Sequence, residues 1–261
     1  MAGLAVHSLY SVADRAFVGH LPSERPLAAV TRSIPVFFVL IALTAGLGAG
    51  ITSGIARAIG ARERGEASRL AATGLLVSLV LGLGYGVAGL LSGPGLAGLL
   101  GSSGATLELA WSYLATLFWA APLFFLSGAM RCVLTGEGDA RTPVRIMTWA
   151  ILLNLVLDPL FIFDPPQLAG LLERLLGLSP GSPLVAALPA LGLGVRGAAL
   201  ATVAAQAFSF LLYLWIFFGR RRTFVRVRPL AAPPSRAALG EILKVGAPTA
   251  AGQLIMGISM A

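Results

Sequence analysis

Residues 35–61 read PVFFVLIALTAGLGAGITSGIARAIGA, and this segment contains no acidic side chain and only one basic side chain, near its end. About 20 consecutive apolar residues allow a helix to cross the hydrocarbon core of a bilayer. The segment therefore predicts a membrane-spanning helix over residues 33–56. Within it, Gly46, Gly50 and Gly54 recur every four residues. Small residues at this spacing let neighbouring helices approach closely in lipid, so we interpret the three glycines as a packing face.

The composition extends this conclusion to the rest of the chain. Of 261 residues, 57% are hydrophobic and 11% are charged, whereas charged residues make up about 25% of a soluble domain. The fold class expected is all-α, a polytopic transmembrane helix bundle. The predicted spans are 2–19, 33–56, 68–92, 109–131, 144–163 and 195–218, with a seventh helix starting near 239. We expect both ends to be truncated, because the first helix is short and the seventh is still running at Ala261.

The positive charges indicate an orientation. The formal net charge is +8, and the basic residues lie mainly in the gaps between apolar runs rather than on one polar domain, which argues against a nucleic-acid partner. The gaps between spans fall alternately on the two sides of the membrane. Those on one side contain 14 basic residues, and those on the other side contain 4. The positive-inside rule places the first set in the cytoplasm. The segments 93–105 and 164–194 are then external, and a short amphipathic piece at 168–177 is expected at the interface.

Enzyme chemistry has little support in the sequence. The single cysteine, Cys132, excludes an internal disulfide, and two scattered histidines, His7 and His20, make an ordinary metal site improbable. The segment GEGDARTP at 136–143 resembles a motif of intramembrane aspartyl proteases, but Asp139 lies in an arginine-bearing turn rather than in a span. We interpret Asp139 as a turn residue or as a charge near the start of a helix.

The segment LLNLVLDPL at 152–160 places polar groups inside an apolar run. A charged Asp near the centre of a membrane helix costs about 2.5–3.5 kcal/mol, so such a residue usually faces a cavity or a partner. Asn154 and Asp158 are four residues apart and share one helix face. Pro159 cannot donate to the carbonyl of Leu155. This group could hold a proton or a small hard cation such as sodium, unless Asp158 simply ends the helix at the outer interface.

A second acidic residue lies in the first expected span. Asp14 is followed by Arg15 in the segment YSVADRAFVGH. The two could form a local pair, or Arg15 could reach the interface. Neighbours on a helix are about 100° apart, so Asp14 could face the bundle while Arg15 does not.

These residues resemble the multidrug and toxic compound extrusion (MATE) family of transporters, in order and over nearly the whole chain. The matching pieces are LYSVADRAFVGHL at 9–21, the segment 35–61, GAMRCVLTGEGDARTPVRIM at 128–147, LLNLVLDPLFIF at 152–163, GLGVRGAALATVAAQ at 192–206 and EILKVGAPTAAGQL at 241–254. The resemblance implies one six-helix lobe of a twelve-helix transporter. In that scheme residues 1–219 are the N-terminal lobe, 220–238 a basic cytoplasmic linker, and 239–261 the start of the second lobe.

The resemblance also implies cation-coupled efflux by alternating access. In the subfamily with its ion site in the first lobe, the matching positions are Asp14, Asn154, Asp158 and Thr202. Some relatives instead carry an acidic residue on the seventh helix, but none occurs between Pro248 and Ala261. The sequence differs from the family pattern at Ser11, Arg15 and Thr135.

The expected setting follows from the same resemblance. It is a bacterial cytoplasmic membrane, with a multi-pass monomer that exports small organic, often cationic, compounds. The coupling ion is a proton or sodium, with no further cofactor and no enzymatic activity. A lipid-linked oligosaccharide flippase of the same broad superfamily and a non-functional transporter fragment are the alternatives.

Overall fold

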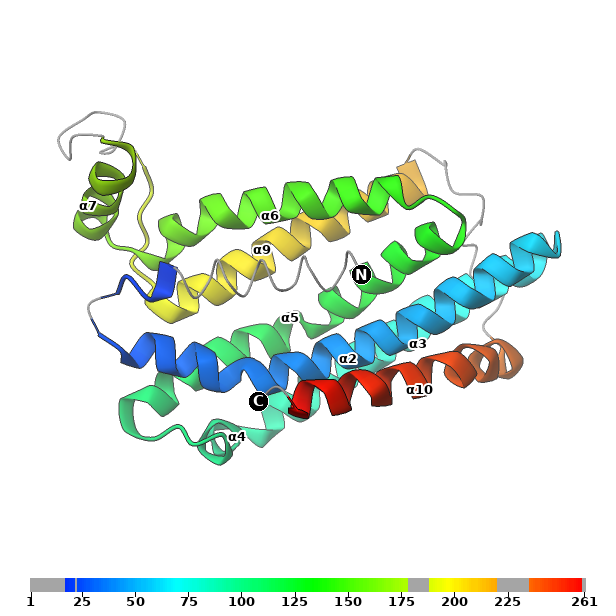
Figure 1. The fold of residues 1–261 in the computed structure, drawn as a ribbon, viewed down its shortest axis with the longest axis horizontal. Helices are drawn as coiled ribbons and strands as arrows, with labels where there is room; N and C mark the ends of the chain where they lie inside the picture. The colour runs from blue at the N-terminus through cyan, green and yellow to red at the C-terminus, as the bar shows by residue number, and fades with distance from the viewer. Residues whose placement is uncertain (1–16, 22, 178–187, 220–234, 260–261) are drawn as a thin grey trace. The chain divides into compact units, whose positions relative to one another are not determined.

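The computed structural model describes residues 17–21, 23–177, 188–219 and 235–259, and every regular element in these ranges is a helix (Figure 1). The predicted span 2–19 therefore lies almost entirely outside the described residues. The elements are α2 (Arg25–Gly60), α3 (Arg64–Ser92), α4 (Pro94–Leu99), α5 (Gly104–Gly136), α6 (Arg141–Ile162), α7 (Pro165–Leu176), α9 (Gly194–Leu214), the π-helix η1 (Trp215–Gly219) and α10 (Arg236–Ser259).

Five of the described helices are long and apolar enough to cross a membrane: α2, α3, α5, α6, and α9 together with η1. They confirm the five predicted spans between residues 33 and 218. The helices are longer than the apolar runs, and α2 begins at Arg25 rather than at residue 33. The prediction followed the apolar runs, but a helix can continue by several residues into the polar region of a bilayer. The seventh predicted helix is α10, which begins three residues earlier than expected.

Two short helices occupy the segments expected to be external. The segment 93–105 contains α4, which the sequence did not predict. The amphipathic piece expected at 168–177 is α7, which starts earlier, at Pro165. The early start is explained by Asp164, whose side chain accepts a hydrogen bond from the backbone N–H of Gln167 at 3.0 Å. The Gln167 side chain accepts in return from the Asp164 N–H, which completes a capping box.

Removing this cap gives a local prediction. We expect Asp164→Ala to destabilise α7 by about 1 kcal/mol, because an N-cap acceptor is lost. Amide hydrogen exchange within α7 should become roughly fivefold faster. Glu173→Ala, in the exposed part of the same helix, is the control and should leave exchange near the wild-type rate. Equal exchange in Asp164→Ala and wild type would show that tertiary contacts alone hold α7.

The described helices fall into two compact units, and most helices contribute a part to each. Unit 1 comprises residues 1–33, 89–117 and 148–205, and unit 2 comprises residues 34–88, 118–147 and 206–261. The division into a lobe at 1–219, a linker at 220–238 and a second lobe from 239 stays a prediction. Residues 220–234 of that linker lie outside the described residues.

Unit 2 has a core in which helices pack at glycines. Ile51, Val133 and Ile242 are fully buried in it. A Cβ atom at Gly50 would overlap the backbone carbonyl of Ile242 in α10, and one at Gly46 would lie 2.6 Å from the carbonyl oxygen of Gly246. The predicted packing face on α2 is therefore confirmed at Gly46 and Gly50, where its partner is α10, whereas a Cβ atom at Gly54 would lie nearest to Leu70 of α3.

One ion pair also joins these two helices. Arg57 at the end of α2 contacts Glu241 in α10, with 2.6 Å between Nη2 and Oε1. The Arg57 side chain is 55% exposed. Because exposed pairs contribute about 0–1 kcal/mol, the glycine contacts rather than the charges hold α2 against α10.

In unit 1 the segment 191–193, just before α9, is hydrogen-bonded through its backbone to the end of α6. The N–H groups of Leu191, Gly192 and Leu193 donate to carbonyls of Leu160, Phe163 and Phe161 respectively, each at 2.9 Å. Gly192 has a φ of +63°, which favours glycine. At Gly197, farther along α9, a Cβ atom would overlap the carbonyl of Phe161, so the two helices touch backbone to backbone.

Candidate functional site

The most deeply buried acidic side chain among the described residues is Asp158 in α6. It is 0% exposed, and Asn154 one turn earlier is 1% exposed. The Asn154 Nδ2 group donates a hydrogen bond to Asp158 Oδ1 at 3.1 Å. The two residues therefore share one helix face, as predicted.

The helix does not end at Asp158. α6 continues to Ile162 and contains Pro159 within it. A carboxylate at a helix end facing water would be exposed, whereas Asp158 is enclosed by protein. The alternative in which Asp158 merely ends the helix at the outer interface is thus wrong. Pro159 supplies no N–H for the carbonyl of Leu155, so polar backbone lies one turn from the carboxylate.

The Asn154 side chain offers a further oxygen. Its Oδ1 atom is buried and has no hydrogen-bond partner among the described residues. A buried carbonyl-type oxygen without a donor is costly in a protein interior. Carboxylate and amide oxygens are also the ligands that hard cations prefer. The pair can therefore accept a proton on Asp158 or supply oxygens to a small cation.

Thr202 lies in α9 and is 6% exposed. Its hydroxyl donates to the carbonyl of Ala198 at 3.1 Å. Asn154, Asp158 and Thr202 all belong to unit 1, where the contact between Gly197 and Phe161 sets α9 against α6. Asp14 and Arg15 lie outside the described residues, so the place of Asp14 in this site stays a prediction.

Asp139, on which the protease interpretation would depend, lies before α6 and outside it. Its Oδ1 accepts the Thr142 N–H at 3.0 Å. Partial burial would raise the pKa of Asp139, but hydrogen bonds from Thr142 and Arg141 and the charge of Arg145 outweigh this and lower it. Asp139 is therefore a charged group at the start of a helix, as its sequence setting indicated. Among the described residues no group of three or more His, Cys, Asp or Glu side chains could hold a metal ion.

One polar contact was missed by the sequence reasoning. In unit 2 the Gln206 side chain in α9 donates to the buried Ser127 hydroxyl in α5. Gln206 is four residues after Thr202, so both lie on one face of α9. The four-residue spacing could have revealed Gln206 from the sequence, because it places a second polar group on the face of α9 that carries Thr202.

Comparisons with known proteins give one consistent result. The MatE family model matches residues 1–160. The chain is 26% identical over 259 residues to the multidrug export protein MepA of Staphylococcus aureus (strain MRSA252), covering 99% of this chain and 51% of the relative. It is 33% identical over 154 residues to an FAD transporter of Shewanella oneidensis, covering 59% of this chain and 34% of the relative.

Solved structures agree with the sequence relatives. The inward-facing conformation of a multidrug resistance MATE family transporter superposes with a TM-score of 0.83 and 35% identity, over 97% of this chain and 51% of that chain. The chain thus spans about half the length of the MepA proteins and of the solved transporter that it matches.

Proposed function

The chain belongs to the MATE family of multi-pass membrane transporters, and from this premise we propose that the protein exports small organic compounds in exchange for protons or sodium ions. The compounds are multidrug-type, often cationic, and the membrane is a bacterial cytoplasmic membrane. The name of the Staphylococcus aureus relative, a multidrug export protein, supports export as the direction.

The observation that carries the proposal is the fully buried Asp158 with Asn154 bound to it in a membrane-spanning helix. An ionised carboxylate removed from water is unfavourable unless a proton or a cation neutralises it. Such a group therefore responds to the occupancy of a coupling ion. The proposed coupling site is Asp14, Asn154, Asp158 and Thr202.

In the proposed cycle, ion binding at Asp158 neutralises the site and favours a different packing of the helices around it. Release of the ion to the cytoplasm restores the first packing. A ligand shifts such an equilibrium only by its difference in affinity for the two states, and charge neutralisation supplies that difference. One cation entering across 100 mV contributes about 2.3 kcal/mol, which sustains a more than tenfold concentration ratio of an uncharged substrate.

The charge of the interior favours an organic cation or a neutral compound over an anionic lipid-linked sugar. A flippase for such a sugar needs basic residues along its cavity. Among the described residues no Lys or Arg is buried, and Asp158 is the buried acidic side chain. The flippase alternative therefore has no support from the described interior.

The coupling ion is tested by exchanging the gradient. In everted vesicles carrying the complete reading frame, we expect uptake of a fluorescent cationic dye to start when a proton or a sodium gradient is imposed. The productive gradient names the ion, and its dissipation by a protonophore or by a sodium ionophore should stop uptake. Vesicles without the protein are the control. Dye uptake that proceeds equally without either gradient would contradict coupled transport.

A further inference from the structure

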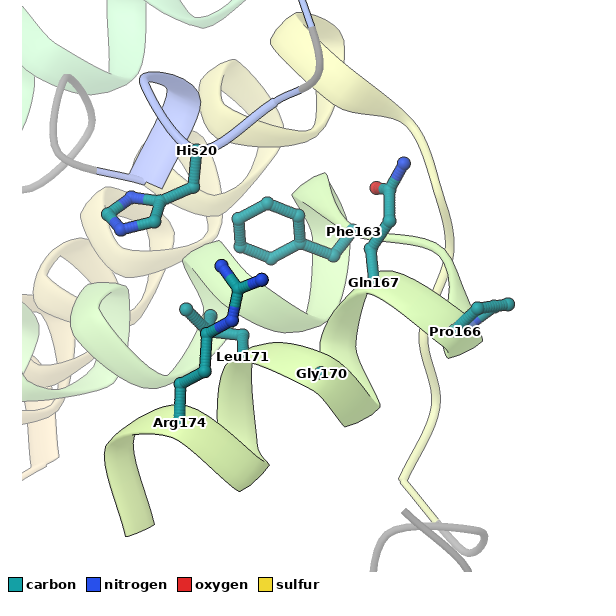
Figure 2. A pocket seen from close by; sticks show the side chains of 7 residues that line it. All are labelled: His20, Phe163, Pro166, Gln167, Gly170, Leu171 and Arg174. Carbon is teal, nitrogen blue, oxygen red and sulfur yellow. The ribbon is translucent and has the colours of Figure 1, made fainter. Parts of the chain in front are cut away.

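A hollow lies in unit 1, apart from the buried Asn154–Asp158 pair. It has a volume of about 270 Å³, and Figure 2 shows the side chains that line it. It is formed by α7, by the end of the chain segment that leaves α6, and by the turn that precedes α2. The lining residues are His20, Phe163, Pro166, Gln167, Gly170, Leu171 and Arg174.

The lining combines a cation with an apolar wall. In Figure 2 the guanidinium of Arg174, the imidazole of His20 and the ring of Phe163 gather at one end of the hollow. Among the described residues, no carboxylate lines it. The acidic residue next to Phe163 in the chain, Asp164, is engaged as the N-cap of α7. The hollow is therefore suited to a negatively charged group.

We expect the hollow to lie where the hydrocarbon of a bilayer gives way to lipid headgroups. The membrane-spanning helix α6 ends at Ile162, and the hollow begins at the next residue, Phe163. The apolar face of α7 is turned inward, since Leu168 and Leu171 are 2% and 8% exposed. A helix that follows a span directly, with its polar side outward, is typical of the membrane–water interface.

We propose that this hollow binds a phosphate group carried by an anionic phospholipid of the adjoining leaflet. The planar fork of Arg174 matches two oxygens of a phosphate. Phe163 and Leu171, both largely buried, form the apolar base of the hollow. The volume is at the small end for ligand pockets, as a headgroup requires. A soluble phosphate ester shares this chemistry and is the other source to be distinguished.

Gly170 allows the hollow to be filled without changing its charge. A Cβ atom at Gly170 meets no heavy atom within 4 Å, and the residue lies inside α7. Gly170→Leu therefore extends into open space, and replacing glycine within a helix does not weaken the helix. Arg174→Gln removes the charge and leaves a shorter, polar side chain. Arg196→Gln, at an exposed arginine of unit 1 that does not line the hollow, is the matched control.

The experiment measures lipid binding to the complete protein in a neutral detergent. Short-chain phosphatidylglycerol is titrated, and bound lipid is counted by native mass spectrometry, for wild type and the three variants. We expect Arg174→Gln and Gly170→Leu each to weaken binding about tenfold, since a charge-assisted contact or the space itself is lost. Arg196→Gln should stay within twofold of wild type.

Competition separates the two sources of phosphate. Glycerol 3-phosphate that displaces the lipid at similar concentration would assign the hollow to the free phosphate group, and failure to displace it would assign it to the lipid. Either result supports phosphate binding at this place. The proposal is overturned if wild type binds no phosphatidylglycerol, if both pocket variants bind it like wild type, or if Arg196→Gln loses as much as Arg174→Gln. These measurements do not involve transport, so their failure leaves the coupling proposal standing.

Discussion

Asp158→Asn is expected to reduce gradient-driven export to the background rate of vesicles without the protein. Asparagine has nearly the volume of aspartate, and its carbonyl oxygen can still accept the 3.1 Å hydrogen bond from Asn154. It cannot gain or lose a proton, and it brings no charge to a sodium ion. The substitution therefore preserves packing at a fully buried position and removes the change in charge on which coupling depends.

The measurement is dye uptake into everted vesicles under the gradient that drives the wild type. The amount of protein in the membrane and its thermal melt should stay near those of wild type, because no cavity and no unpaired charge is created. Glu108→Gln is the matched control, since it neutralises an exposed carboxylate in the second turn of α5 in unit 1. Transport by Asp158→Asn at the wild-type rate would rule out Asp158 as the coupling residue.

Gly50→Leu is expected to have the largest effect on stability. A Cβ atom at Gly50 already overlaps the carbonyl of Ile242, and the overlapping atoms belong to backbone. Overpacking of a core usually costs about 1–3 kcal/mol when side chains can shift, and here α2 and α10 themselves must separate. We expect a cost at or above the upper end of that range, with little folded protein recovered.

Gly84→Leu provides the comparison for this second substitution. Gly84 is an exposed glycine in α3, and a Cβ atom there meets nothing within 4 Å. Both variants are compared by thermal unfolding in detergent, followed by size-exclusion chromatography. Gly84→Leu should elute and melt like wild type. A Gly50→Leu variant that also melts within about 2 °C of wild type would mean that α2 and α10 do not depend on their close approach.

The spans could be predicted because lipid imposes one simple requirement on sequence. A run of apolar residues long enough to cross the hydrocarbon core identifies the helix, and all five described spans were found in this way. The helix ends were predicted less well, because apolar residues are required only within the hydrocarbon core and a helix can extend beyond it. Arg25 begins α2 in the polar region, where charge no longer opposes a helix. The short helix α4 has too few residues to leave a periodic pattern.

The residues of the candidate coupling site differ in how well the sequence alone predicts them. Asn154 and Asp158 are one turn apart, so the helix period alone brings them together. Thr202 came from the family resemblance, since nothing in its local sequence distinguishes it. The hollow beside α7 was not predicted. His20 is far in sequence from Phe163 and Arg174, and only the folded chain brings the three to one place.

The backbone hydrogen bonds between residues 191–193 and the end of α6 have a consequence for how this region can evolve. They use groups that every residue but proline possesses, and the side chains of Leu191 and Leu193 are 52% and 40% exposed. Apart from Gly192 and Gly197, the join between α6 and α9 thus places little demand on amino-acid identity. Insertions and deletions between the two helices can accumulate while the join persists, so homologous chains should vary in length here and keep a glycine at the position of Gly192.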